Sequence, residues 1–138
     1  MSAGDLADLT AAAIVEATTG GEVTAVAVVE ACLARIAERD GALNAFSVVL
    51  ADEARAEAAR RDASLAAGEE PGPLHGVPVA IKEEIDVAGC VTTFGGRGNV
   101  TPAAQDGEVV RRLRQAGAVV IGKTRMPEFG QWPFTESV

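Results

Sequence analysis

The sequence is poor in lysine, histidine and cysteine, and each scarcity narrows the classes of function. Of its 12 basic residues only two are lysines, Lys82 and Lys123, and it has a single histidine. Its two cysteines, Cys32 and Cys90, lie far apart and lack the close spacing of a metal-binding pair. We therefore expect unpaired thiols, no metal site and no cofactor.

Long apolar runs and excess positive charge are also missing. No apolar run approaches the roughly 20 residues that span a bilayer. Residues 1–9 carry Asp5 and Asp8 but no basic residue, unlike a secretory signal. A net charge of -8 argues against a general attraction to phosphate backbones. We expect a soluble cytoplasmic protein with neither membrane nor nucleic acid as a partner.

The first part of the chain predicts two helices. At 138 residues the chain has the length of one ordinary domain. Thr10 can cap a helix that ends at the pair of glycines at 20–21, and Thr24 can cap a second helix with one apolar stripe. We expect these helices to pack together as a helical hairpin.

The remainder predicts an α/β fold. Residues 45–50 favour a strand and residues 51–67 an exposed helix, followed by a loop rich in Gly and Pro. Residues 77–81 have the apolar, β-branched character of a strand buried on both faces, with Lys82 at its end, although Pro78 indicates the start of the strand or an edge position. Asp106 can cap a helix that runs to Gly117, and residues 118–121 form another buried strand. A strand, a helix and a strand in this order predict a βαβ unit in a mixed sheet.

Two short motifs point to nucleotide chemistry, and their context opposes both. Residues 117–124 match the phosphate-binding pattern G-x-x-x-x-G-K-[ST]. The four residues between the glycines are themselves strand-like, and an extended run cannot wrap around a phosphate. A nucleotide binder therefore stays a distant alternative, and the role of Lys123 stays open. Residues 79–82 resemble the lysine strand of protein kinases, but the other kinase motifs are absent.

A longer set of motifs, in a fixed order, resembles the amidase-signature family. The matching residues are Leu-His-Gly-Val-Pro-Val-Ala-Ile-Lys at 74–82, Ile-Asp-Val-Ala-Gly at 85–89, Thr-Thr at 92–93, residues 117–124, and Glu128-Phe129. The likeness covers nearly all of residues 1–138, which correspond to about the first quarter to third of a usual member. It implies the amino-terminal part of an α/β/α amidase fold.

The resemblance also implies a chemistry. Family members hydrolyse amide bonds of small, non-protein substrates, or transfer the ammonia released. They use a serine nucleophile, a second serine in a cis peptide, and a lysine that Lys82 matches. A lysine base must be neutral although its ordinary pKa is about 10.4, so the resemblance implies that burial lowers the pKa of Lys82. Local sequence alone favours an ordinary surface ion pair with Glu83 or Glu84.

The catalytic serines are not matched in this chain. Its four serines, Ser2, Ser47, Ser64 and Ser137, do not sit in the family motif, which in relatives lies beyond the position of Val138. We therefore expect the isolated chain to be inactive, as a truncated product or as one chain of a split amidase. Open sheet edges and an unfinished core predict that the lone chain self-associates or unfolds.

Five further residues carry expectations. Glu83 stands where an aspartate usually follows the lysine, and Gly96 stands where a serine often follows Gly95, which is expected to alter hydrogen bonding near the site. The family triad uses no histidine, so His75 is expected to be structural or solvent-facing. Thr92 and Thr93 are expected to bond to the loop backbone instead of acting as nucleophiles.

Overall fold

The chain folds around a three-stranded mixed sheet. The computed structural model describes residues 3–135. Strands β1 (Phe46–Val49), β2 (Pro78–Lys82) and β3 (Val119–Thr124) lie in the order β1-β3-β2, with β2 parallel and β1 antiparallel to β3. The helices are α1 (Ala3–Leu6), α2 (Ala11–Thr19), α3 (Ala25–Leu43), α4 (Ala51–Ala66), α5 (Glu108–Gln115) and the 3-10 turn η1 (Glu128–Gly130).

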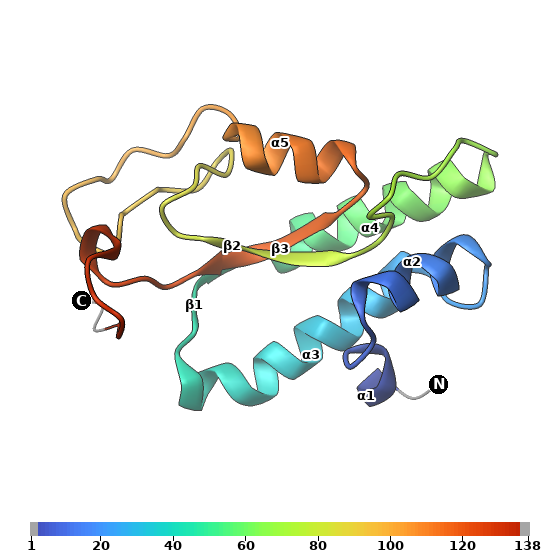
Figure 1. Ribbon diagram of the computed structural model, residues 1–138, viewed down its shortest axis with the longest axis horizontal. Coiled ribbons are helices and arrows are strands. Elements are labelled where there is room, and N and C mark those ends of the chain that lie inside the picture. The colour runs from blue at the N-terminus through green and yellow to red at the C-terminus, as the bar shows by residue number, and fades with distance from the viewer. Residues whose placement is uncertain (1–2, 136–138) are drawn as a thin grey trace.

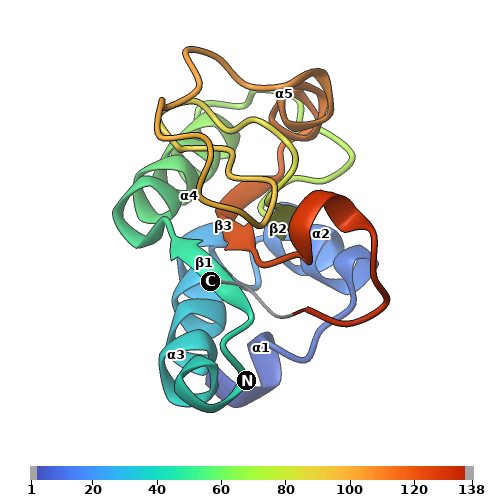
Figure 2. The same cartoon turned by 90° about the vertical axis from the view of Figure 1, so that its left-hand side faces the viewer.

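Helices lie on both sides of this sheet, as the sequence predicted. Helix α5 lies on one side of it, and α1, α2 and α3 lie on the other (Figure 1). The view along the sheet in Figure 2 shows the same separation, with α4 beside β1 and β3. The predicted βαβ unit is confirmed, because α5 connects the parallel strands β2 and β3.

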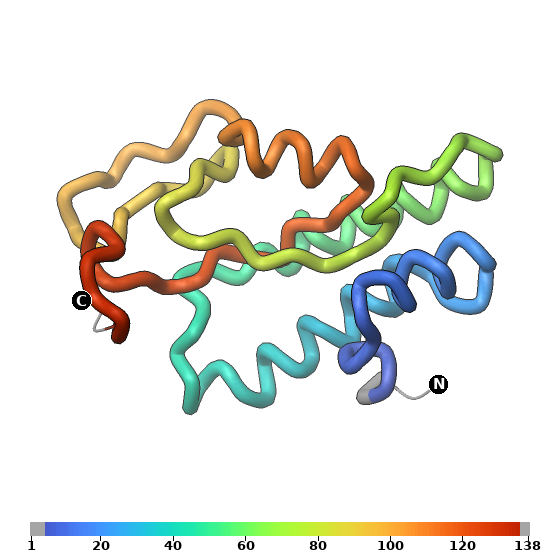
Figure 3. Tube along the Cα trace, in the orientation of Figure 1, coloured from blue at the N-terminus to red at the C-terminus, as the bar shows by residue number. Residues whose placement is uncertain are grey.

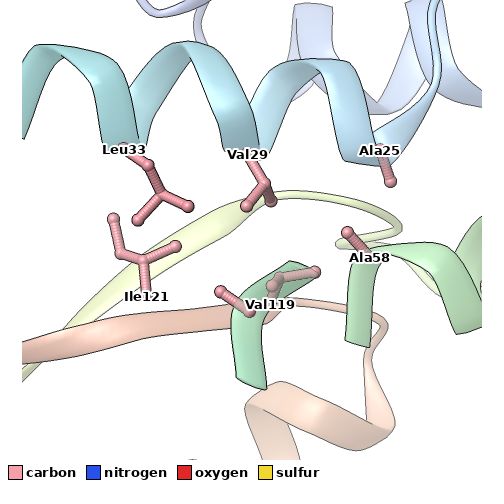
Figure 4. Packing of buried hydrophobic residues seen from close by; sticks show 7 residues of the cluster. Ala25, Val29, Leu33, Ala58, Val119 and Ile121 are labelled. Carbon is pink, nitrogen blue, oxygen red and sulfur yellow. The ribbon is translucent and has the colours of Figure 1, made fainter. Parts of the chain in front are cut away.

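Strand β3 is the centre of the core. Val119 and Ile121 face a cluster formed by α3 and α4, which Figure 4 shows from close by with Val29, Leu33 and Ala58. Val120 belongs to a second cluster, with Val110 of α5. Because side chains of a strand alternate between its two faces, one short apolar run supplies both halves of the core.

The helix starts were predicted with mixed success. Thr10 and Thr24 accept hydrogen bonds from the amides of Ala13 and Ala27, so both predicted caps are confirmed. The cap at Asp106 was wrong: α5 starts after Gly107, which has no side chain to offer. The carboxylate of Asp106 instead accepts hydrogen bonds from other groups, namely the backbone amide of Ala88 and the guanidinium of Arg114.

Gly117 ends α5 as expected and also permits a close approach. Its φ of +97° is one that side chains rarely adopt, and a Cβ there would lie 2.9 Å from the Cα of His75. The loop before β2 can therefore lie directly against the end of α5. The amide of Leu74 donates to the carbonyl of Ala116, and the amide of Gly76 donates to that of Gly117.

Two packing expectations need correction. The predicted helix pair touches through Ile14 of α2 and Val28 of α3, whereas α3 lies mainly against α4 and α1. Strand β2 is not buried on both faces, because only Ile81 of its five residues is buried. It forms an edge of the described sheet, which suits Pro78 at its start. None of the helices within residues 3–135 is long and apolar enough to cross a membrane.

Candidate active site

Lys82 is the last residue of β2, as predicted. It pairs in register with Thr124 of β3, while Ile81 pairs with Lys123. Because neighbouring residues of a strand point to opposite faces, Lys82 points away from the α5 side, where Ile81 is buried. The side chain of Lys82 is 49% exposed, and its Nζ lies 3.0 Å from Oε1 of Glu84. The surface ion pair that local sequence favours is therefore present, and the burial implied by the resemblance is not found among residues 3–135.

The next residue, Glu83, is buried. Its amide donates to the carbonyl of Thr124 over 3.0 Å, which continues the pairing of β2 with β3. Its Oε1 accepts a hydrogen bond of 2.6 Å from Oγ1 of Thr93. That hydroxyl also accepts from the amide of Gly95, over 3.2 Å. Glutamate at this position therefore reaches across to the loop that follows β2.

Lys123, whose role the sequence left open, is completely buried in β3. Its Nζ donates to Oγ1 of Thr92 over 3.0 Å and to the carbonyl of Val91 over 3.2 Å. The Thr92 hydroxyl in turn donates to Oδ1 of Asp86 over 2.6 Å. Burial lowers the pKa of Lys123, and the nearby Cys90, Glu83 and Asp86 oppose this shift.

This strand overturns the phosphate-loop alternative. Residues Val119–Thr124 are extended and paired on both sides, so their amides cannot wrap around a phosphate. The amine of Lys123 points into the interior, toward Thr92. The next helical residues, Glu128–Gly130, form a single 3-10 turn and not the long helix that such a loop precedes.

The loop after β2 closes against the segment after β3. A Cβ at Gly95 would lie 2.6 Å from the carbonyl oxygen of Met126, and the amide of Phe129 donates to the carbonyl of Phe94. A Cβ at Gly96 would lie 3.1 Å from Oε1 of Glu128, so a serine there would crowd that carboxylate. The two segments meet near Lys82, whose Nζ is 3.9 Å from where a Cβ of Gly130 would lie. Figure 3 shows these segments side by side at one end of the sheet.

His75 is structural and lies elsewhere in the fold. It is only 3% exposed, in the loop between α4 and β2, and its carbonyl accepts a hydrogen bond from Thr18 of α2. Its Nε2 has no hydrogen-bond partner among the described residues. Burial lowers the pKa of His75, the positive charge of Arg61 lowers it further, and Asp62 opposes them. Of the two roles expected for His75, the structural one is therefore confirmed and the solvent-facing one is wrong.

The remaining candidate groups have local partners. Ser47 donates to the carbonyl of Lys123, and Ser64 donates to Glu69. Ser2 and Ser137 lie outside the described residues.

Both cysteines are free, as expected. Thr92 and Thr93 bond mainly to the side chains of Asp86, Glu83 and Lys123, and less to the backbone than expected. Residues 3–135 contain no group of three or more His, Cys, Asp or Glu that could hold a metal ion.

The buried network around Lys123 is what the sequence did not reveal. The sequence predicted a buried strand only over residues 118–121, whereas β3 continues to Thr124, so Lys123 lies inside the strand and not beyond its end. Its partners Thr92 and Asp86 come from a loop. The spacing of apolar residues in a sequence does not predict which strand a loop packs against.

Comparison with known proteins agrees with this architecture. The family model named Amidase matches residues 27–138. AmiB2 of Mycobacterium tuberculosis, whose name describes it as an amidase, is 51% identical in sequence to this chain. The match covers 97% of this chain and 29% of AmiB2. An amidase of Pseudomonas putida is 44% identical over 90% of this chain and 26% of its own length. The chain thus spans less than a third of these relatives.

Solved structures give the same result. The native peptide amidase of Stenotrophomonas maltophilia superposes with a TM-score of 0.86 at 35% sequence identity, covering 98% of this chain and 28% of that one. This likeness confirms the predicted fold as the amino-terminal part of an amidase-signature α/β/α fold. Together with the family match over residues 27–138, it shows that the chain belongs to the amidase family.

Proposed function

We propose that residues 1–138 form the amino-terminal segment of an amidase domain that hydrolyses the amide of a small molecule to a carboxylate and ammonia. In this proposal Lys82 is the general base. The observation that carries it is the position of Lys82, at the end of β2 and within the family motif, in a chain 51% identical to AmiB2. The domain assignment and the role of Lys82 both rest on the family resemblance.

The proposed chemistry needs groups beyond Lys82. A neutral Lys82 takes the proton of the cis serine, which takes the proton of the nucleophilic serine. The nucleophile then attacks the amide carbonyl, backbone N–H groups stabilise the oxyanion, and the amine leaves after accepting a proton. Water then hydrolyses the acyl-enzyme and releases the acid. Both serines are supplied from outside residues 1–138, so the isolated chain is inactive.

The surroundings of Lys82 are suited to completion by further polypeptide. Its amine is half-exposed and paired with Glu84, as expected for an ammonium facing water. A segment that covers this end of the sheet would exclude water and compete with Glu84, and both changes favour the neutral amine. The exposed face of Lys82 is therefore where the missing serines would dock.

Two alternatives concern the state of the chain. Besides a segment of a working amidase, the chain could be a non-catalytic truncated product, or one chain of a split amidase whose second polypeptide supplies the serines. Native mass spectrometry of the purified protein distinguishes them by the presence of a second polypeptide. The same proposal includes a small-molecule substrate, a cytoplasmic location, and no nucleic-acid or membrane partner. Cell fractionation tests the location and membrane binding, and a pull-down tests nucleic-acid binding.

A graft tests the proposed function. Residues 1–138 replace the matching segment of AmiB2, and ammonia release is measured with simple aliphatic and aromatic amides. The graft should release ammonia, whereas the isolated chain and a Lys82→Met graft should not. A Lys82→Met graft with the activity of the unmodified graft would show that Lys82 is not the base. An inactive but folded graft would count against the proposed function itself.

A further inference from the structure

A charged amine inside the protein is costly unless it has partners. The Lys123 side chain has no exposure, and both of its described hydrogen-bond acceptors come from one loop: the carbonyl of Val91 and the hydroxyl of Thr92. The charged groups that act on it are Glu83, Asp86 and the thiol of Cys90. The amine therefore ties the loop after β2 to the centre of the sheet.

The same loop holds both carboxyl groups that face Lys123. The Thr92 hydroxyl donates to Asp86, and the hydroxyl of its neighbour Thr93 donates to Oε1 of Glu83. Glu83 directly follows Lys82 in the chain, and its amide is bonded to Thr124 of β3. Two hydrogen bonds and two peptide bonds thus form a continuous path from Lys123 through Thr92, Thr93 and Glu83 to Lys82.

The loop also supports the other side of Lys82. Its residues Phe94–Gly96 contact the segment from Met126 to Phe129, and the rings of Phe94 and Phe129 lie 6.1 Å apart. Gly130 then passes beside the amine of Lys82. Both the backbone that carries Lys82 and the surface beside its amine therefore depend on the loop that Lys123 anchors.

We propose that Lys123 is a positioning residue for Lys82, acting through Thr92, Thr93 and Glu83. This inference rests on the proposed function only in calling Lys82 the base. Without the ammonium of Lys123, Thr92 loses its anchor and Glu83 faces the interior without a cation nearby. The turn after β2 then no longer fixes the direction of the Lys82 side chain.

The isolated chain tests this coupling without any activity, because Lys82 and Lys123 are its only lysines. Acetylation of Lys82 by an amine-reactive ester is followed by mass spectrometry at a temperature where every variant is folded. Lys123→Met and Thr92→Val should speed acetylation about threefold, the size expected when an exposed ion pair is no longer held. Thr92→Ser keeps the hydroxyl and should match the unmodified chain.

A core variant controls for destabilisation. Val29→Ala removes buried volume between α3 and α4, in a core cluster that contains no residue of this loop, and should lower the melting temperature without changing the acetylation of Lys82. If the Lys123→Met and Thr92→Val chains are folded and acetylate Lys82 at the unmodified rate, the proposal is wrong. It is equally wrong if Val29→Ala speeds acetylation as much, because general loosening would then explain the effect.

The AmiB2 graft gives the second readout. Lys123→Met and Thr92→Val should each lower kcat about tenfold with little change in KM, as expected when a catalytic group is misplaced. Combining them should cost no more than either alone, because both break one path. Additive losses, or no loss, would overturn the proposal. If the unmodified graft releases no ammonia, the proposed function fails, while the acetylation rates still decide whether Lys123 positions Lys82.

Discussion

His75 and Arg61 place two unpartnered nitrogens in the interior. Nε2 of His75 and Nε of Arg61 are both buried, and neither has a hydrogen-bond partner among the described residues. Arg61 is held elsewhere, by Glu57 and by the carbonyl of Arg114. Adding a proton to His75 would thus place a second positive charge, without an acceptor, beside a guanidinium.

We predict that the chain loses stability as pH falls from 7 to 5.5. The pKa of folded His75 lies below its ordinary value of 6.5, so the unfolded chain binds the proton more tightly and is favoured as pH falls. The loss is at most about 1.4 kcal/mol per pH unit below pH 6.5, the limit for one proton. Urea unfolding at several pH values measures it.

A His75→Gln chain is the control for this loss, since His75 is the only histidine. Its stability should change less between pH 7 and 5.5 than that of the unmodified chain. Equal slopes for the two chains would show that other groups cause the loss. The acidic groups with a lowered pKa, such as Glu108 at about 2, titrate below this window.

At the level of single residues, the sequence located Lys82 but not its surroundings. An apolar run that stops at a lysine indicates the end of a strand, and the residues next to Lys82 are enough to predict this. Local sequence favoured the surface ion pair that Lys82 makes with Glu84, whereas the family resemblance implied burial, which depends on segments distant in sequence. The predicted strand stopped at Ile121, so neither the burial of Lys123 nor its partners Thr92 and Val91 were predicted.

Among the elements, the start of α3 depends on a side chain from another helix. Asp62 of α4 accepts hydrogen bonds from the amides of Ala25 and Val26, over 2.7 and 3.1 Å, in addition to the Thr24 cap. A carboxylate at this position meets the positive end of the helix dipole. It also joins α3 to α4 at the edge of the main core cluster.

We predict that Asp62→Ala lowers the free energy of unfolding by about 1–2 kcal/mol, the loss typical of a helix cap with a charge. Asp62→Asn keeps one acceptor oxygen and should lose less. Urea denaturation of the three chains at pH 7 measures both changes. Unchanged stability in Asp62→Ala would mean that water satisfies these amides equally well.

Local signals predicted elements better than contacts between them. Thr10 and Thr24 cap their helices because the bonds involved span only three residues. Asp106 failed as a cap because Arg114 and the amide of Ala88 compete for its carboxylate. Strand β2 was placed correctly but expected to be buried, because an apolar run does not tell a central strand from an edge strand.

At the scale of the whole molecule, several large apolar side chains of the described residues are exposed. Four aromatic side chains are at least 39% exposed, in the segments near Lys82 or at the end of the described chain: Phe94, Phe129, Trp132 and Phe134. Strands β1 and β2 are both edges of the described sheet. Such surfaces are normally covered by further polypeptide.

We predict that the isolated chain self-associates through this surface. Sedimentation velocity should show a larger species as the protein concentration rises. Replacing Trp132 and Phe134 by serine should shift the chain toward the monomer, whereas replacing the exposed Val109 of α5, on the other side of the sheet, should not. A monomer at every concentration, with a sharp and concentration-independent melting transition, would contradict this prediction and indicate a complete domain.

The central claim is that Lys82 is the base of an amidase to which this chain contributes only the first segment. The most direct measurement is the rate of ammonia release by the AmiB2 graft with and without Lys82→Met. We predict measurable release by the graft and a loss of at least about a thousandfold in the variant, the scale seen when a member of a catalytic set is removed. Equal rates from two folded grafts would contradict the claim.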